Sequence, residues 1–166
     1  VHRGAAYGGL GSLKDAFNDF RLAADLDPRS KEAWTGICQT RRLRKEFSAA
    51  AKDCTRALEI DPNFAPAYLQ RGLAFLRMRE PGRAISEINN ASQLGLRRAE
   101  GLLGQSYAHA MVKQYKEAHK VYLAAMLLDS GARSFQTNFG APRGDMDDYF
   151  TALADLDALI SADGAD

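Results

Sequence analysis

The sequence repeats every 34 residues, and this period limits the possible fold more than any other feature. One column of the repeat holds only alanine, at Ala16, Ala50, Ala84, Ala118 and Ala152. Two apolar columns follow four and seven positions later, at Phe20, Cys54, Ile88, Tyr122 and Leu156 and at Ala23, Ala57, Ala91, Ala125 and Leu159. Spacings of four and three put the three columns on one face of a helix. Sequence periods of this length are typical of helical solenoids.

A second helix in each period is indicated by a column of small residues, at Gly4, Cys38, Gly72, Ser106 and Gly140. Small residues in two columns twelve positions apart imply two helices whose backbones approach closely. Pro28 and Pro62 end apolar patterns that they cannot continue as helix, and Pro81 can open a helix. The sequence therefore predicts helices at about 2–9, 13–26, 31–44, 47–60, 65–78, 81–94, 98–112 and 115–128.

The pattern resembles the tetratricopeptide repeat. The second period carries the resemblance through Ala33, Trp34, Ile37, Cys38, Ala50, Cys54, Ala57 and Pro62. Neighbouring periods match at Gly4, Tyr7, Ala16, Phe20, Ala23 and Pro28, and at Tyr68, Gly72, Phe75, Ala84 and Ala91. The resemblance implies an all-α fold, a right-handed α-solenoid of antiparallel helix pairs. It also implies a concave inner surface that binds peptides or partner domains.

The resemblance divides the chain into three parts. Residues 1–128 are expected to form four repeats, and the first of these lacks the residues that would begin its first helix. We therefore expect the natural protein to extend upstream. Residues 129–144 are expected to be an irregular loop, because Gly140, Pro142 and Gly144 oppose a helix. Residues 145–166 are expected to form a capping helix in phase with a degenerate fifth repeat.

Composition fits a single domain that can bury a core. The chain has 166 residues, of which 46% are hydrophobic, and no apolar run approaches the about 20 residues that cross a bilayer. Two cysteines are too few for a disulfide framework, so we expect Cys38 and Cys54 to be neighbouring, buried, reduced thiols in a reducing cytoplasm. The three histidines lack metal-ligand spacing. We therefore predict no catalytic residues, no metal and no cofactor.

The partner-binding residues are expected on the inner face of each first helix, on the stripe that the packing columns leave free. This stripe holds Thr35, Gln39, Arg42, Leu69, Leu73, Leu76, Arg77, Leu103 and Tyr107. The resulting groove would be apolar in its middle and basic at one side. It predicts a protein or peptide partner with an apolar anchor and acidic residues. The alternative is that Leu69, Leu73 and Leu103 pack against adjoining first helices.

Members of this family often grip the acidic C-terminal tails of heat-shock chaperones with a clamp of Lys, Asn and Arg. In one register the matching positions of this chain hold Thr35, Gln39, Gln70, Glu100 and Gly104. In the other register they hold Val1, Ala5, Gly36, Pro66 and Gln70. Neither set supplies the charges that a carboxylate needs, so we predict no such clamp.

The uneven distribution of charge along the chain is compatible with other kinds of partner. Residues 1–128 carry 20 Lys and Arg against 13 Asp and Glu, whereas residues 129–166 carry two Arg against eight Asp. A basic run over 41–45 is either a solvated face or a site for an acidic partner, with RNA as an alternative. A further alternative is a purely architectural role through the ends and the convex face. The incomplete first repeat could also mediate self-association.

Overall fold

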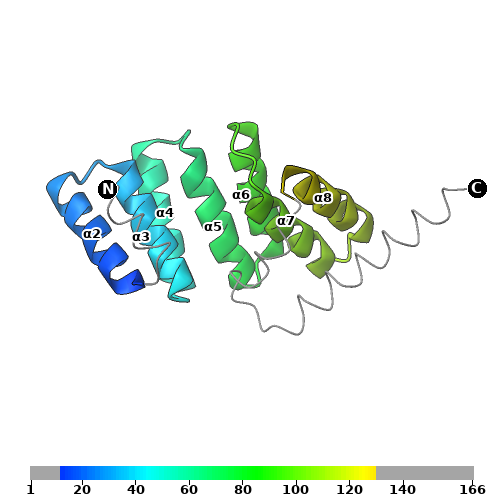
Figure 1. The fold of residues 1–166 in the computed structure, drawn as a ribbon, viewed down its shortest axis with the longest axis horizontal. Coiled ribbons are helices and arrows are strands. Elements are labelled where there is room, and N and C mark those ends of the chain that lie inside the picture. The colour runs from blue at the N-terminus through cyan, green and yellow to red at the C-terminus, as the bar shows by residue number, and fades with distance from the viewer. Residues whose placement is uncertain (1–11, 130–166) are drawn as a thin grey trace, which may run out of the picture.

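The computed structural model describes residues 12–129, which form seven helices and no strand (Figure 1). The helices are α2 (Leu13–Leu26), α3 (Lys31–Leu43), α4 (Phe47–Ile60), α5 (Ala65–Arg77), α6 (Pro81–Gln93), α7 (Ala99–Met111) and α8 (Tyr115–Leu128). Every predicted boundary in this range agrees to within one residue. The predicted helix at 2–9, the loop after Asp129 and the capping helix at 145–166 lie outside the described residues.

The helices form antiparallel pairs that stack side by side along the molecule (Figure 1). The pairs are α3 with α4, α5 with α6, and α7 with α8, and the second helix of each pair also packs against the next first helix. First helices of successive pairs touch as well, α3 with α5 and α5 with α7. This arrangement confirms the prediction of an all-α solenoid built from 34-residue units.

The core follows the repeat columns. The alanines at 16, 50, 84 and 118 are fully buried, so each repeat has one small, completely enclosed side chain at the same position of its second helix. Larger members of the next column, Phe20, Ile88 and Tyr122, fill the space beside them and are also buried. The sequence columns thus correspond to layers of one continuous packing pattern.

Each turn inside a pair reverses the chain through a residue in the left-handed region. Lys45, Arg79 and Lys113 have φ values of 65°, 61° and 61°, although none of them is glycine. The amide that follows each of them donates back to a carbonyl five residues earlier, as from Glu46 to Arg41 at 2.9 Å. This is the six-to-one hydrogen bond of a Schellman ending, so the turns repeat in geometry as well as in sequence position.

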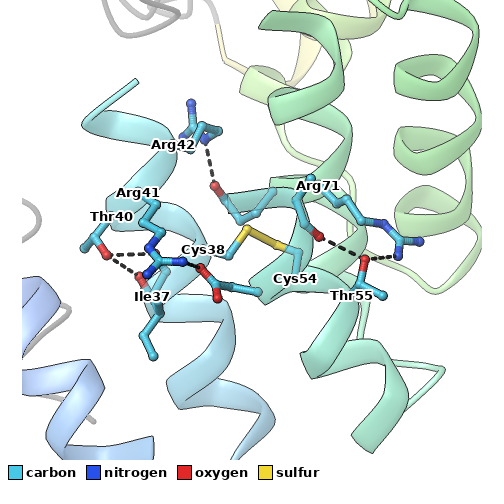
Figure 2. The surroundings of a disulfide bond; sticks show 12 residues. Ile37, Cys38, Thr40, Arg41, Arg42, Cys54, Thr55 and Arg71 are labelled. Carbon is cyan, nitrogen blue, oxygen red and sulfur yellow. Dashed lines mark hydrogen bonds and ion pairs between the residues drawn. A yellow bond between two sulfur atoms is a disulfide. The ribbon is translucent and has the colours of Figure 1, made fainter. Parts of the chain in front are cut away.

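A disulfide joins Cys38 on α3 to Cys54 on α4 (Figure 2). The Sγ atoms are 2.06 Å apart, the Cα atoms are 5.4 Å apart, and both side chains are fully buried. The prediction that the two residues are neighbours is confirmed. The prediction that they are reduced thiols is wrong for this structure. The two columns bring the sulfur atoms into bonding distance at the centre of the helix pair, which the count of cysteines does not reveal.

Candidate functional site

The nine predicted partner-binding residues all lie on the first helices, but at different depths. Six of them are buried, namely Thr35, Arg42, Leu69, Leu73, Leu76 and Leu103. Leu69, Leu73 and Leu103 belong to one core cluster that extends from α5 across α7 to α8. The prediction that these leucines are free of packing is therefore wrong, and the alternative reading, packing between first helices, describes them. Gln39 is exposed, and Arg77 and Tyr107 are partly exposed.

Arg42 is the deepest charge on this face and has its partners within the chain. Its side chain is only 5% exposed. Nε donates to Oε1 of Gln70 on α5 at 3.0 Å, a bond drawn in Figure 2, and Nη2 donates to Oε1 of Glu100 on α7 at 3.2 Å. Burial lowers the pKa of Arg42, and the Glu100 carboxylate opposes that shift. One guanidinium therefore links three first helices, α3, α5 and α7.

This polar link changes what the inner face can bind. Because Glu100 already neutralises Arg42, an acidic group of a partner would have to displace a carboxylate to reach it. Sequence reasoning placed Gln70 and Glu100 at clamp positions but did not connect them with Arg42. They stand 28 and 58 residues away along the chain. The only signal of this link in the sequence is Glu100, an acidic residue at a position where a clamp has a cation.

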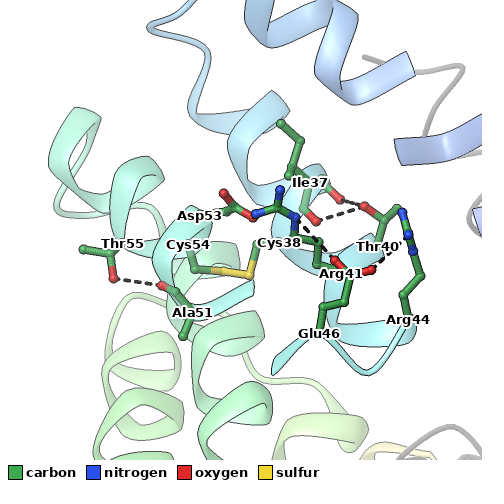
Figure 3. A network of polar contacts seen from close by, with 11 residues as sticks. Ile37, Cys38, Thr40, Arg41, Arg44, Glu46, Ala51, Asp53, Cys54 and Thr55 are labelled. Carbon is green, nitrogen blue, oxygen red and sulfur yellow. Dashed lines mark hydrogen bonds and ion pairs between the residues drawn. A yellow bond between two sulfur atoms is a disulfide. The ribbon is translucent and has the colours of Figure 1, made fainter. Parts of the chain in front are cut away.

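Most of the basic run at 41–45 is also paired internally (Figure 3). Arg41 donates to Asp53 at 2.9 Å and lies 3.7 Å from a Glu46 oxygen, while Arg44 contacts the other Glu46 oxygen at 3.0 Å. Burial raises the pKa of Asp53, with Arg41 opposing the shift. Both guanidinium groups also lie over the Phe17 ring. Intramolecular pairing therefore accounts for these arginines without an acidic partner or RNA.

Arg77 completes the basic side of the inner face. It lies on the last turn of α5, with its guanidinium 5.2 Å from the centre of the Phe47 ring. Partial burial lowers its pKa.

Within residues 12–129 there is no group of three His, Cys, Asp or Glu side chains that could hold a metal ion. In the same range no helix is long and apolar enough to span a bilayer. The accessible side chains of the inner face are therefore the amide of Gln39, the guanidinium of Arg77 and the phenol of Tyr107, and the leucines lie buried beneath them.

Comparison with known proteins gives partial matches to larger chains. No protein-family model matches the chain. The DnaJ homolog subfamily C member 7 homolog of Schizosaccharomyces pombe is 27% identical over 146 residues, covering 78% of this chain and 31% of that protein. The TPR repeat-containing thioredoxin TDX of Arabidopsis thaliana is 32% identical over 83 residues, covering 50% of this chain and 22% of that protein. The chain thus spans less than a third of these relatives.

Solved structures show the same arrangement of helices. MamA superposes with a TM-score of 0.65 at 22% identity, covering 79% of this chain and 77% of its own. The first TPR of Spaghetti (RPAP3), bound to the HSP90 peptide SRMEEVD, gives a TM-score of 0.62 at 20% identity, covering 67% of this chain and 88% of its own. At such identities the likeness establishes the fold and leaves binding to be argued from this chain's own residues.

Proposed function

Because the helices have the arrangement of tetratricopeptide-repeat proteins, we propose that the chain holds a partner protein or peptide on its inner face, as an adaptor or scaffold arm. The observation that carries this proposal is the set of accessible polar residues above the buried leucines, Gln39 on α3, Arg77 on α5 and Tyr107 on α7. They lie on three successive first helices, so one extended segment can contact all of them. The buried leucines fix the spacing of those helices.

The experiment places a photo-crosslinking amino acid, benzoylphenylalanine, at Gln39. The matched control places it at Gln93, which is also an exposed glutamine but lies on the second helix α6. Partners that crosslink at position 39 and not at position 93, identified by mass spectrometry, support binding on the inner face. Equal crosslinking at both positions would contradict the proposal and favour the architectural role through the convex face.

We further propose that the inner face does not clamp acidic chaperone tails. Glu100 stands where a clamp needs a cation, and it already pairs with Arg42. We expect the HSP90 peptide SRMEEVD, which is bound in the RPAP3 structure, to show no saturable binding at micromolar concentrations. Isothermal titration calorimetry measures this directly. Micromolar affinity would show that the peptide displaces Glu100 or binds elsewhere on the domain.

The remaining parts of the proposal concern the whole chain. Residues 1–128 act as four repeats, and residues 145–166 cap the stack beyond the loop at 129–144. RNA binding is less favoured, because the arginines at 41 and 44 are paired with carboxylates. A gel shift at two salt concentrations tests it, since phosphate-driven binding weakens steeply with salt.

Intracellular location is likewise proposed from composition, since two cysteines do not make a disulfide framework. The Cys38–Cys54 disulfide is the observation that weighs against a permanently reducing compartment. Alkylating the protein rapidly inside cells, followed by mass analysis, decides between the two. Two alkylated cysteines support the reducing cytoplasm, and none supports an oxidising compartment.

A further inference from the structure

A hollow of about 390 Å³ lies between the second helices α4 and α6, in the middle of the stack. Ala51 and Thr55 line it from α4, Phe75 lines it from α5, and Met78 lines it at the end of α5. The helices around it are all described, with α2 and α3 before them and α7 and α8 after them. The repeat that follows α4 is therefore in place here, and it leaves the hollow open.

Ala51 is the smallest residue at its position of the repeat. Its counterparts in the other described second helices are Phe17, Ile85 and His119. The centre of the Phe17 ring lies 5.4 Å and 5.2 Å from the guanidinium carbons of Arg41 and Arg44. The residues 34 positions after these two arginines are the phenylalanine and the methionine that line the hollow. The repeat geometry thus accommodates a bulky apolar side chain at the place where Ala51 leaves space.

The rim of the hollow favours an aromatic side chain over an aliphatic one. Arg83 of α6 lines the hollow, and its guanidinium carbon lies 3.6 Å from the centre of the Phe75 ring. Phe75 covers one face of this guanidinium, and the exposed side chain has its other face available to a second ring. Phe17 makes the same kind of contact with two guanidinium groups in the preceding repeat.

Two exposed charges of opposite sign flank the hollow on α4. Lys52 and Glu59 both line it and stand seven positions apart, so they lie on one stripe of the helix. Within residues 12–129 neither of them has an ion pair or a hydrogen bond. The other charge that lines the hollow, Arg83, is paired with Glu80. The hollow therefore has a net charge near zero, with a cation towards one end and a carboxylate towards the other.

We propose that this hollow binds a helix of a partner protein that carries one aromatic residue between a carboxylate and a cation. The ring enters the hollow, packs on Ala51 and Met78 and stacks on Arg83. The carboxylate, one helical turn from the ring, faces Lys52, and the cation, one turn away on the other side, faces Glu59. A second copy of this chain satisfies the charges but brings no ring, because the large exposed apolar side chains of residues 12–129 all lie outside α4 and α6.

The test measures fluorescence anisotropy of a labelled helical peptide of about 16 residues, with one phenylalanine, a glutamate one turn before it and a lysine one turn after it. We expect the whole chain to bind this peptide saturably below millimolar concentration, and to bind the version with alanine for phenylalanine about tenfold more weakly or worse. Ala51→Ile, which copies Ile85, fills the hollow from within and should weaken binding about as much. Lys52→Glu should also weaken it, and a lysine in place of the peptide's glutamate should restore it.

The matched control is Lys120→Glu, which reverses an exposed lysine at the same position of α8. It should leave peptide binding unchanged, and circular dichroism should show the variants folded. If Ala51→Ile does not fold, the charge exchange at Lys52 decides alone. Absence of saturable binding at millimolar peptide, full binding by a folded Ala51→Ile protein, or equal losses in Lys120→Glu and Lys52→Glu would overturn the proposal. So would dimers in sedimentation that dissociate in Lys52→Glu. Crosslinking at Gln39 on a first helix is independent of these outcomes, so either proposal can fail alone.

Discussion

At the scale of single residues, two glycines show how differently the same substitution acts in this repeat. Gly36 on α3 faces the ring of Phe20, and a Cβ added there would overlap ring carbons. Gly82 on α6 has no atom within 4 Å of an added Cβ. Both are helical, so alanine gains helix propensity at each site. At Gly36 this gain in helix propensity is offset by a clash with the buried Phe20 ring, whereas at Gly82 nothing opposes it.

We therefore predict effects of opposite sign. Gly36→Ala should lower the free energy of unfolding by about 1–3 kcal/mol, because the buried ring has to move. Gly82→Ala should raise it by up to about 0.5–1 kcal/mol. Urea denaturation followed by circular dichroism measures both. A Gly36→Ala protein as stable as wild type would mean that α2 shifts freely against α3.

A second residue-scale prediction concerns Asp61, which follows α4. Its carboxylate accepts from Lys31 Nζ and, at 2.9 Å, from the Asn63 amide, and these bonds hold the pKa of the carboxyl below its usual value. A carboxyl whose pKa is lower in the folded state stabilises the fold above its unfolded pKa, and this contribution is lost as pH falls. Asp61→Asn should therefore lower the melting temperature at pH 7.

The pH dependence is the control for Asp61. At an acidic pH low enough to protonate the carboxyl in the folded state as well, the variant and the wild type should melt at nearly the same temperature, in contrast to pH 7. Differential scanning calorimetry at the two pH values gives the comparison. An equal difference at both would mean that the substitution acts through packing or loop conformation and not through ionisation.

At the scale of elements, the turns within each pair carry backbone strain. Lys113 has φ 61° in the turn from α7 to α8, a conformation that costs a residue with a Cβ about 1–2 kcal/mol. Lys113→Gly removes that cost but gives the unfolded chain more freedom, worth about 0.4–1 kcal/mol. We predict a net gain of about 0.5–1 kcal/mol in urea denaturation. Arg44→Gly, where φ is −80°, is the control and should destabilise.

The disulfide is the strongest constraint on one helix pair. Cys38 and Cys54 are 16 residues apart, and closing a loop of about this size stabilises by roughly 3 kcal/mol, chiefly by restricting the unfolded chain. Cys38→Ala with Cys54→Ala should lose about this amount and keep its helical circular dichroism, because the alanine columns still pack. A reductant should lower the melting temperature of wild type and leave that of the variant unchanged. Equal effects on both proteins would contradict the assignment of a stabilising bond.

The helices could be predicted from the sequence, because the same pattern of apolar and small residues recurs in every 34-residue period. Each helix boundary is supported by its counterparts 34 residues away, as with α2 and α4, which match their predicted ranges. The oxidation state of Cys38 and Cys54 could not be predicted, since spacing indicates proximity and not chemistry. The left-handed lysines were also missed, because only glycine and asparagine signal that conformation in a sequence.

At the scale of the whole molecule, the Arg42 link departs from the usual rule for repeat proteins. In most solenoids each repeat contacts only its neighbours, so stability is a sum of local terms. Here Arg42 in the second repeat reaches Glu100 in the fourth, with Gln70 between them. Sequence columns cannot predict such a link, because it joins different columns across two repeats. It couples the first helices α3 and α7, between which α5 lies.

This coupling yields the last prediction. Glu100→Gln leaves a buried guanidinium without its counter-charge and should cost about 1–3 kcal/mol. The double variant with Arg42→Met should lose less unfolding free energy than the two single variants lose in sum, because each single change removes the same interaction. Hydrogen exchange should show faster opening of α7 and α8 than of α3 and α4 in Glu100→Gln, since the disulfide still ties the latter pair. Additive losses and uniform exchange would mean that the repeats are coupled through their apolar core alone. The Arg42–Glu100 pair would then contribute no stability, and a partner's carboxylate could replace Glu100 at no cost to the fold.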